Sequence, residues 1–499
     1  MGTHSQDQTL STRTHKNGHA LVIGGSIAGL LAARVLTDYF DQVTIIDRDV
    51  FPETPTHRKG APQSHHTHGL SGRGKVIIDA LFPGIFADLR AVGADTIHDK
   101  VAMVMVSSFG MLAPFNVRES MRFSRYLLEW HLRERLVQRS DVQTLSNCEV
   151  TELLATSDHT RIVGVKLRER GLEGRRTTLT ADFVVDASGR NSKTPQWLTA
   201  LGYETPPVDS VNSGLGYASR FYEKPENFPD VWQGIFILPR PRQNPRAGTI
   251  AMIENNVWHV TLSGVAGHYP PTDEEGFLQW ARDLPDPGLY ESIRIAKPLT
   301  TIRGYRVLEN HIRHYERLKR WPAGFIVLGD AVCALNPIRG QGMAAGAIGA
   351  DTLNMCLREQ QRLSRTTFEQ HFQLQLARAL TDPWLFALGE DLRWPDVTLH
   401  GARLPIGFEL WQRYLDLVLQ SAVQDPEISK AYMEVYGMLA PQSSLARPRI
   451  LLRVLGATLK HMLIPSTLTT NNTGVLSAET LAQLHARPTR LIANTGETV

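Results

Sequence analysis

Apolar positions in the first fifty residues change period twice, which predicts a strand, a helix and a second strand. Residues 19–23, HALVI, form a short apolar run typical of a buried parallel strand. Apolar and small residues then recur at helical spacing from Ile27 to Leu36, and a second apolar run follows at 43–46. This order predicts one unit of a parallel α/β sheet, with a tight turn at residues 24–29.

Similar patterns recur along the rest of the chain. Apolar runs at 183–185 and 325–328 predict two more buried strands, and strand-like stretches at 101–115 and 234–264 predict a separate sheet. From residue 363 onward the pattern is helical, with helices expected at 366–380, 406–424 and 427–438. The apolar, basic stretch 451–463 suits a packed C-terminal helix better than an interfacial one. Residues 1–18 and 486–499 are expected to be a disordered leader and tail.

Composition restricts the function classes. The chain has 499 residues, enough for two or three packed units, and a formal net charge of +3, too balanced to argue for nucleic acid binding. Its three cysteines have no CxxC spacing, which argues against disulfides and a structural zinc site and favours a reducing, cytoplasmic compartment. No run of 18 apolar residues is present, so no membrane span is expected.

The turn at 24–29, GGSIAG, predicts a dinucleotide site. Gly24 permits the sharp turn, Gly29 lets the helix pack on the strand, and Asp47, 23 residues after Gly24, stands where a ribose would be bound. Ser26 replaces the glycine expected beside the pyrophosphate. A serine is tolerable there if its φ is negative, and its hydroxyl could donate to a phosphate at the helix N-terminus. The alternative is an ordinary tight turn; the acid at the right distance favours a dinucleotide, without separating NAD from FAD.

Two further blocks bear on the choice of cofactor. The strand at 183–185 leads into the small-residue turn Ala187-Ser188-Gly189, which alone is a weak signal. The strand at 325–328 leads into Gly329-Asp330, a loop with Pro337, and Gly340-Gln341-Gly342-Met343 at the start of a helix rich in alanine and glycine. Asp330 could accept a hydrogen bond from a ribityl hydroxyl, and the helix start directs N–H groups at a ligand. A tightly packed core helix would explain the small residues but not this order of motifs.

The three blocks, in this order, resemble the flavoprotein hydroxylase group of FAD monooxygenases over residues 19–360. The resemblance implies a pyrophosphate site in the first turn, Asp47 at the adenosine ribose, Asp330 at the ribityl chain, and the flavin ring at Pro337 and 340–343. Cys333 departs from the histidine that relatives often carry, and no role is assigned to it. The cofactor contacts expected in these blocks are Gly24, Ser26, Ile27, Ala28, Gly29, Asp47, Arg48, Ala187, Ser188, Gly189, Gly329, Asp330, Pro337, Gly340, Gln341, Gly342 and Met343.

The segment 57–70, HRKGAPQSHHTHGL, carries four histidines, but their spacing does not match a zinc motif. We interpret it as a loop that leads to a helix at 75–81 and brings Arg58 and Gln63 near the cofactor. It is similar to the RKGxPQxxHxH segment of bacterial FAD oxidoreductases that include the epoxidases of polyether biosynthesis. Ser124-Arg125 at the head of a helix to Leu136, and the stretches 382–384 and 440–442, are similar as well, and Arg125 is expected to point toward FAD.

The resemblance also implies a division of the chain. The fold class expected is α/β, with a discontinuous Rossmann-like FAD-binding domain at 19–99, 124–205 and 300–362. A substrate-binding sheet is expected at 100–123 and 206–299, and a helical region at 363–485. Flexible or aromatic side chains of that sheet are candidates to line an apolar substrate cavity, although core packing is the simpler role for each; these are Met103, Met105, Phe109, Phe236 and Trp258.

The activity implied is that of an FAD-dependent monooxygenase using NAD(P)H and O₂. A C4a-hydroperoxyflavin would transfer one oxygen atom to an alkene or another electron-rich carbon of a large hydrophobic polyketide or terpenoid. Epoxidation requires no protein base, whereas hydroxylation of an aromatic polyketide would want one that the sequence does not identify. A halogenase, a prenyl reductase and a non-catalytic flavin binder remain alternatives, although no WxW pair of a halogenase is present. No second glycine fingerprint exists, so NAD(P)H would bind transiently or an external reductase would supply reduced flavin.

Overall fold

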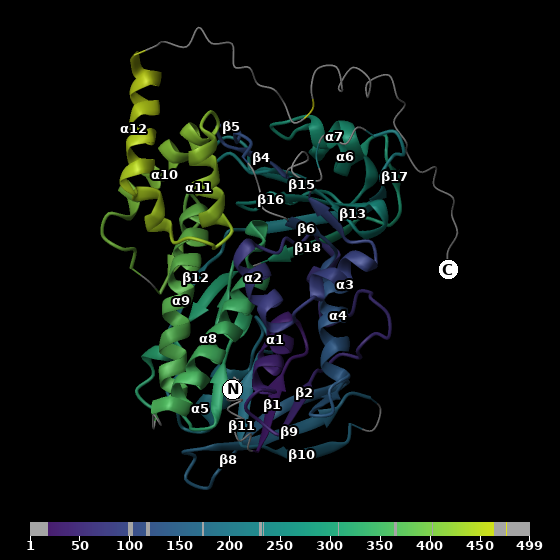
Figure 1. The fold of residues 1–499 in the computed structure, drawn as a ribbon, viewed down its shortest axis with the longest axis vertical. Helices are drawn as coiled ribbons and strands as arrows, with labels where there is room; N and C mark the ends of the chain where they lie inside the picture. Colours follow the sequence, from purple (N-terminus) through teal and green to yellow (C-terminus); the bar gives the residue numbers. More distant parts are fainter. Residues whose placement is uncertain are drawn as a thin grey trace, which may run out of the picture.

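The structure is a computed structural model that describes residues 18–97, 103–115, 120–171, 174–228, 232, 234–307, 309–363, 367–401, 403–463 and 476. The expected tail at 486–499 lies outside the described residues, as does the expected leader except for Gly18. In Figure 1 the parallel sheet lies in the lower half of the molecule, a larger sheet lies above it, and C-terminal helices run along one side.

A five-stranded parallel sheet holds the predicted strands, in the order β20-β11-β1-β2-β7. The apolar runs form β1 and β2 as predicted. Four of the five residues in each strand are buried, because other elements cover both faces of the sheet. β11 and β20 join β1 on one side although they come from distant parts of the chain. The strands are β1 (His19–Ile23), β2 (Gln42–Ile46), β7 (Val142–Leu145), β11 (Phe183–Asp186) and β20 (Phe325–Val327).

Helices and a small antiparallel sheet enclose the parallel sheet. Helix α1 packs on α8, which in turn packs on α2 and on α9 (Phe368–Asp391), and α1 also contacts α4. The antiparallel sheet β10-β9-β8 contacts β11 and β2. The elements are α1 (Ile27–Leu36), α2 (Gly72–Leu81), α3 (Ile85–Ala91), α4 (Arg125–Val137), α5 (Thr194–Ala200), α8 (Gly342–Leu363), β8 (Cys148–Ala155), β9 (Ile162–Glu169) and β10 (Arg176–Thr180).

An eight-stranded sheet stands over the parallel one, in the order β17-β13-β16-β15-β14-β4-β5, with β18 also paired to β13. Its far face packs on helices α6 (Glu274–Arg282) and α7 (Gly288–Ile293) through a core that includes Trp258. The strands are β4 (Met103–Ser107), β5 (Gly110–Met111), β13 (Leu215–Glu223), β14 (Gly234–Ile237), β15 (Arg246–Ile253), β16 (Val257–Gly264), β17 (Lys297–Pro298) and β18 (Arg303–Val307).

Two smaller sheets connect these layers. A four-stranded sheet, β21-β19-β12-β22, consists of β12 (Val208–Val211), β19 (Asn310–Arg313), β21 (Cys333–Ala334) and β22 (Leu399–His400). A two-stranded one pairs β3 (Asp95–Ile97) with β6 (Ser120–Arg122).

The C-terminal part is helical, as predicted, with one corrected boundary. The helix expected at 366–380 is α9 (Phe368–Asp391), which continues through Pro383. A proline costs a helix one N–H donor, yet burial of Pro383, Trp384 and Phe386 stabilises the second half. The remaining helices are α10 (Phe408–Ala422), α11 (Pro426–Tyr436) and α12 (Pro448–Leu463).

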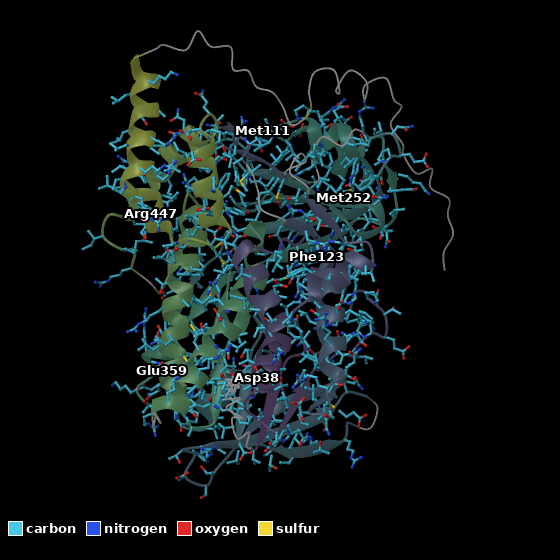
Figure 2. All side chains as sticks on the ribbon, in the orientation of Figure 1. Asp38, Met111, Phe123, Met252, Glu359 and Arg447 are labelled. Carbon is cyan, nitrogen blue, oxygen red and sulfur yellow. The ribbon has the colours of Figure 1, made fainter. Side chains whose placement is uncertain are left out.

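Side chains fill the space between these layers. Figure 2 shows Phe123 and Met252 within the molecule, and both are 7% exposed, whereas Asp38 and Arg447 lie at its periphery. The main core surrounds the parallel sheet, and the eight-stranded sheet carries a separate core on each of its two faces. The predicted fold class, an α/β Rossmann-like domain with a second sheet and a helical C-terminal region, is confirmed.

Candidate active site

The carboxyl ends of three parallel strands meet at one edge of the sheet. Ile23 of β1 pairs with Asp186 of β11, and Asp186 pairs with Val327 of β20. The turns after these strands are the three predicted motifs, at 24–29, 187–189 and 329–330, so register alone brings them together. Ligands of open α/β sheets bind outside this edge.

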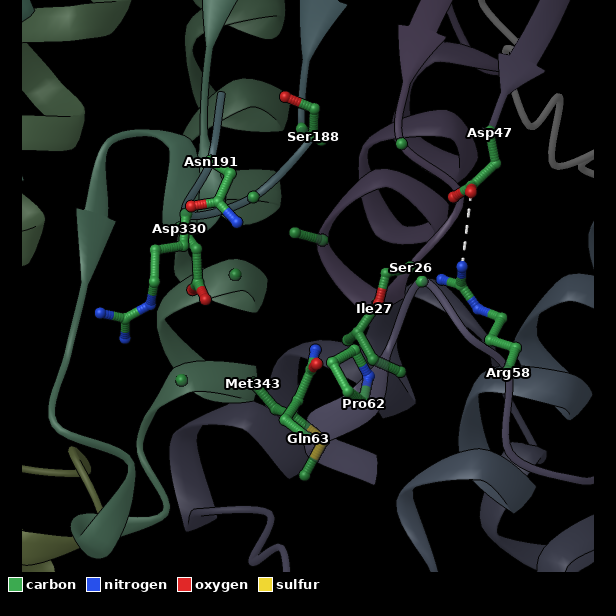
Figure 3. Close-up of a pocket in the computed structure, with 18 of the residues that line it drawn as sticks. Ser26, Ile27, Asp47, Arg58, Pro62, Gln63, Ser188, Asn191, Asp330 and Met343 are labelled. Carbon is green, nitrogen blue, oxygen red and sulfur yellow. Dashed lines mark hydrogen bonds and ion pairs between the residues drawn. The ribbon is translucent and has the colours of Figure 1, made fainter. Parts of the chain in front are cut away.

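A cavity of about 350 Å³ lies at this edge and extends under the eight-stranded sheet. Figure 3 shows Asp47 and Arg58 on one side of it and Asp330 on the opposite side, with Ser26 and Ile27 between them. Most of the expected cofactor contacts line it: Gly24, Ser26, Ile27, Ala28, Asp47, Arg48, Arg58, Gln63, Arg125, Ala187, Ser188, Gly189, Asp330, Pro337, Gly340, Gly342 and Met343.

Three expected contacts do not line the cavity, and each has a structural reason. A Cβ on Gly29 would lie 1.8 Å from the carbonyl oxygen of Gly24, so this glycine permits close packing of α1 on the turn. Gly329, in the turn after β20, has a φ of +66°, and a Cβ there would lie 2.8 Å from the Cβ of Ala28 on α1. The Gln341 side chain points away and donates from Nε2 to the Tyr436 carbonyl oxygen at 3.0 Å.

Ser26 has the negative φ that a serine in this turn requires, −97°. Its hydroxyl, however, donates to Glu129 Oε2 at 2.8 Å and accepts from Arg125 Nη2 at 2.6 Å. The hydroxyl hydrogen is therefore engaged with a carboxylate and is not directed at the place of a phosphate. What Ser26 offers a ligand is the start of α1, with its free backbone N–H groups.

A buried ionic network, which the sequence did not predict, surrounds this turn. Arg58 Nε donates to Glu129 Oε1 at 2.6 Å, and its Nη1 lies 3.4 Å from Asp47 and 3.3 Å from Asp49. Arg125 Nη2 lies 3.0 Å from the same Glu129. Burial opposes ionisation of Glu129, but the charges of Arg125 and Arg58 outweigh it and lower its pKa. The only signal for Glu129 in the sequence is its i+4 spacing from Arg125 on α4.

Asp47 is held in place by the turn itself. Its Oδ2 accepts from the backbone N–H of Gly25 at 2.7 Å, and its Oδ1 accepts from that of Asp49 at 2.8 Å. A carboxylate oxygen can accept more than one hydrogen bond, so the aspartate can still accept from a ligand hydroxyl.

Asp330 and the start of α8 form the opposite side of the cavity. Burial raises the pKa of Asp330 above its ordinary value, although the charges of Arg190 and Arg125 partly oppose this shift. Gly340 has a φ of +65°, and a Cβ there would lie 3.6 Å from the backbone nitrogen of Gly69. The histidine segment thus passes directly beside the glycine loop that opens α8.

The histidine segment is fixed to the eight-stranded sheet by a directed chain of hydrogen bonds. Thr67 Oγ1 donates to the His259 carbonyl oxygen at 3.1 Å, and Thr261 Oγ1 donates to Thr67 Oγ1 at 2.9 Å. Because Thr261 has one hydroxyl hydrogen, the 2.6 Å contact between Ser219 and Thr261 has Ser219 as the donor. Ser219 Oγ must then accept from His66 Nδ1, at 2.7 Å.

This chain fixes the tautomers of two histidines in the cavity wall. His66 carries its proton on Nδ1, and His68 Nδ1 donates to the His66 carbonyl oxygen at 2.7 Å, so both Nε2 atoms are acceptors. Burial lowers the pKa of His66 to about 4 and that of His68 well below its usual value. The Tyr217 hydroxyl, also in the wall, is buried and has no partner among the described residues. The sequence placed these histidines in a loop expected near the cofactor, but it assigned no role to any of them.

None of the five expected substrate-lining residues lines this cavity. Trp258 faces the far side of the sheet, 1% exposed among Phe228 and Trp232, because alternate strand residues face opposite ways. Phe109 is 41% exposed at the β4–β5 turn. Register places Met105, Phe236 and Thr249 in one row with Thr261, on the near face. Met105 and Phe236 belong to the core against α10 and α11, and Met103, on the same face, contacts Arg122.

Comparison with known proteins identifies a relative for most of the chain. No protein-family model matches it. Protein Rv3254 of Mycobacterium tuberculosis (strain ATCC 25618 / H37Rv) is 30% identical over 433 residues, which are 84% of this chain and 90% of that protein. The chain belongs to the Rv3254 family.

Solved structures of low sequence identity share the fold of this Rv3254 family member. The flavoprotein/dehydrogenase from Cytophaga hutchinsonii aligns with a TM-score of 0.62 and 16% identity, covering 89% of this chain and 99% of that one. The flavin-dependent brominase Bmp2 gives 0.60 and 12%, with the same coverage. The p-nitrophenol 4-monooxygenase PnpA from Pseudomonas putida DLL-E4 gives 0.59 and 14%, covering 85% and 98%. The fold is thus that of flavin-dependent monooxygenases and halogenases.

The described residues lack two further kinds of feature. They contain no group of three or more His, Cys, Asp or Glu side chains arranged to hold a metal ion. No helix in the part of the chain that the structure describes is long and apolar enough to span a bilayer.

Proposed function

We propose that this protein is an FAD-dependent monooxygenase that adds one oxygen atom to an electron-rich carbon of a hydrophobic small molecule. The observation that carries the proposal is the single cavity that joins three strand-end turns to the N-termini of α1 and α8. A dinucleotide needs hydrogen-bond donors at its pyrophosphate and acceptors for its sugar hydroxyls. The cavity offers donors at the start of α1 and acceptors at Asp47 and Asp330.

The residues of the cavity fit FAD on grounds independent of the shared fold. Backbone at the start of α1 would meet the pyrophosphate, with Arg58 and Arg125 as nearby positive charges. Asp47 and Asp330 would accept from ribose and ribityl hydroxyls at opposite sides. Gly340, Gly342 and Met343 would lie against the flavin ring, where the start of α8 stabilises negative charge. When bound, FAD would supply O₂ activation, with one oxygen entering the product, the other leaving as water, and two electrons coming from NAD(P)H.

The eight-stranded sheet would bound the substrate side. The histidine segment is tied to this sheet by hydrogen bonds to Ser219 of β13 and to His259 and Thr261 of β16. The substrate class that the sequence resemblance favours is a polyketide or terpenoid alkene, which would be epoxidised. A transient NAD(P)H site or an external flavin reductase would provide the electrons.

Hydroxylation of an aromatic substrate is the second candidate, and one observation favours it. His66, His68 and Tyr217 line the cavity, and the hydrogen bonds of the two histidines leave their Nε2 atoms unprotonated. A phenol that donates a hydrogen bond to such an acceptor becomes a more electron-rich carbon nucleophile. An alkene would make no use of these groups. Halogenation and prenyl reduction on the same fold are weaker candidates, because no residue of the cavity favours either one.

The test is to purify the protein, release its cofactor by heat and identify the flavin by chromatography. The holoenzyme is then assayed for O₂ uptake and NAD(P)H oxidation, with and without an added flavin reductase. Candidate substrates are the polyene and phenolic intermediates of neighbouring biosynthetic genes. The expected product is heavier by one oxygen atom, and ¹⁸O₂ supplies that atom.

The controls separate the alternatives. His68→Gln removes the free imidazole nitrogen and should slow turnover of a phenol while sparing epoxidation of an alkene; His131→Gln, on the outer part of α4, should change neither. A halogenated product, or a saturated one formed without O₂ uptake, would refute the monooxygenase. A protein that binds no flavin would refute the cofactor assignment itself.

A further inference from the structure

The loop that opens α8 has two sides with different groups. Toward the main cavity, the loop and the first residues of the helix present Pro337, Gly340, Gly342 and Met343. Away from the cavity, the loop carries three polar residues that are at most 6% exposed, namely Asn336, Arg339 and Gln341. The glycines offer no side chain that could fix the backbone from the cavity side. The position of the loop must therefore be set from the opposite side.

The backbone N–H groups of this loop bond locally. Among the described residues, those of Ile338, Arg339 and Gly340 donate only within the loop itself. Ile338 donates to Asn336 Oδ1 at 3.1 Å, and Gly340 donates to the Pro337 carbonyl oxygen at 2.9 Å. Side chains therefore supply the attachment to other elements, through the apolar packing of Ile338 and through the three polar groups.

The end of α9 holds two of these polar side chains through consecutive carboxylates. Asn336 Nδ2 donates to Asp391 Oδ1. Arg339 Nη2 donates to Glu390 Oε2 at 2.8 Å. The third side chain, that of Gln341, is bound to α11. The start of α8 is thus tied from behind to two C-terminal helices, and mainly to the last turn of α9.

Asp391 is also fixed on the side away from the loop. The residue is 5% exposed, and its Oδ2 accepts from Asn310 Nδ2 of β19 at 2.9 Å. Hydrogen bonds to a charged acceptor are stronger than those between neutral groups. Asn336 is held at both ends, because its Oδ1 caps Ile338 while its Nδ2 meets the carboxylate. Asp391 therefore provides a rigid point against which the loop is placed.

We propose that Asp391 is a positioning residue for the flavin ring, because through Asn336 it holds the loop 336–340 where the start of α8 meets that ring. The inference rests on the proposed FAD site and adds to it a residue that does not line the main cavity. A flat ring packs against bare backbone only when that backbone lies at contact distance. A displaced loop would weaken binding of the flavin end of FAD and leave the adenosine end, at α1, unaffected.

The test compares FAD with ADP, which would occupy only the α1 end of the cavity. Asp391→Ala removes the acceptor, and Asn336→Ser removes the donor while its hydroxyl can still cap Ile338. If either variant keeps the loop in its present position about one tenth of the time, the dissociation constant of FAD rises about tenfold. The constant of ADP should stay unchanged. Both constants are measured by calorimetric titration of the full-length apoprotein.

A double variant rebuilds the link with the two groups exchanged. In Asn336→Asp/Asp391→Asn, the new amide at 391 donates to the new carboxylate at 336, and its oxygen still accepts from Asn310. The carboxylate at 336 still caps Ile338. This variant should restore the FAD constant to within about twofold of the original value, since the same hydrogen bonds are present.

Asp416→Asn is the matched control. Asp416 pairs with Arg393, just beyond the end of α9, but its side chain is 40% exposed, and neither constant should change in this variant. Equal losses of FAD and ADP affinity in Asp391→Ala and Asn336→Ser would reveal a general structural role and overturn the proposal. An unchanged FAD constant, or a double variant that restores nothing, would overturn it as well. An unmodified protein that binds ADP but not FAD would instead refute the proposed function.

Discussion

Glu129 is the side chain whose replacement tests the ionic network at the first turn most directly. Its carboxylate accepts hydrogen bonds from Ser26 at 2.8 Å and Arg58 at 2.6 Å. Arg125 Nη2 lies 3.0 Å from it as an ion pair, and both arginine side chains are 6% exposed. Glu129→Gln keeps the shape but removes the charge. Arg125 has no other ion pair among the described residues, whereas Arg58 keeps its longer contacts to Asp47 and Asp49.

The expected cost follows from this arrangement. Breaking a buried ion pair by removing one partner costs about 3–5 kcal/mol. We expect the lower end, near 3 kcal/mol, because Arg58 is still paired and a glutamine oxygen can still accept from Arg125. The assay is urea unfolding of the flavin-free protein, followed by tryptophan fluorescence, since Trp130 is the next residue on α4.

Glu134→Gln, on the same helix, is the control. The Glu134 side chain is 36% exposed and lies 3.9 Å from Arg133, so its loss should cost less than about 1 kcal/mol. The pKa of Glu129 is lowered in the folded protein. Its contribution is therefore present above pH 4.5 and lost as pH falls below it, and the two variants should converge in acid. A loss in Glu129→Gln no larger than that of Glu134→Gln would refute the network as a source of stability.

Further predictions concern the turn, the opposite side of the cavity and pH. Ser26→Gly should retain flavin, measured as the ratio of 450 to 280 nm absorbance. Ser26→Val should lose it, because a branched apolar side chain would face Arg125 and Glu129. Full flavin content in the valine variant would contradict the placement of the pyrophosphate at this turn. Gly29→Ala should also lose flavin, since its Cβ would meet the Gly24 carbonyl oxygen at 1.8 Å, while Gly171→Ala, with open space around it, should not. Asp330→Ala should weaken FAD binding by about tenfold, the loss of one hydrogen bond to a charged acceptor, in titrations of the apoprotein with FAD. Burial lowers the pKa of both His259 and His311 from 6.5 to about 3. The free energy of unfolding is therefore fully present above pH 6.5 and should fall toward pH 3 by up to about 1.4 kcal/mol per histidine and pH unit. A melting temperature that stays constant from pH 7.5 to 5.5 would contradict the burial of these histidines in neutral form.

The sequence predicted the backbone of the site well, because that part is encoded locally. Gly24 and Gly29 lie at fixed offsets from an apolar strand, and the strand ends at 186 and 327 follow from short buried runs. A parallel sheet then brings such ends to one edge whatever the distance between them in the chain. Nothing beyond periodicity and turn chemistry was needed for this.

Features that depend on side-chain direction were not predictable in the same way. Trp258 and Thr261 stand on one strand, and only register decides which of them faces the cavity. Gln341 lies within a cofactor motif yet bonds to α11, which the motif does not encode. The role of His66 follows from hydrogen bonds to Ser219, more than 150 residues away. Such pairings are properties of the assembled layers and not of any single segment.

The strand order has a consequence for the life of the chain before it is complete. β1, the centre of the parallel sheet, is made among the first residues, but β20 and the loop that opens α8 follow about 300 residues later. At ribosomal rates of roughly 5–20 residues per second, the two are separated by roughly 15–60 s. For the later part of that interval, the 325 − 186 = 139 residues between the end of β11 and the start of β20, β11 has an open edge where β20 will pair, a place for misassociation with other chains. Slower translation beyond residue 186 would lengthen this exposure, and a chain ending before residue 325 would never close that edge.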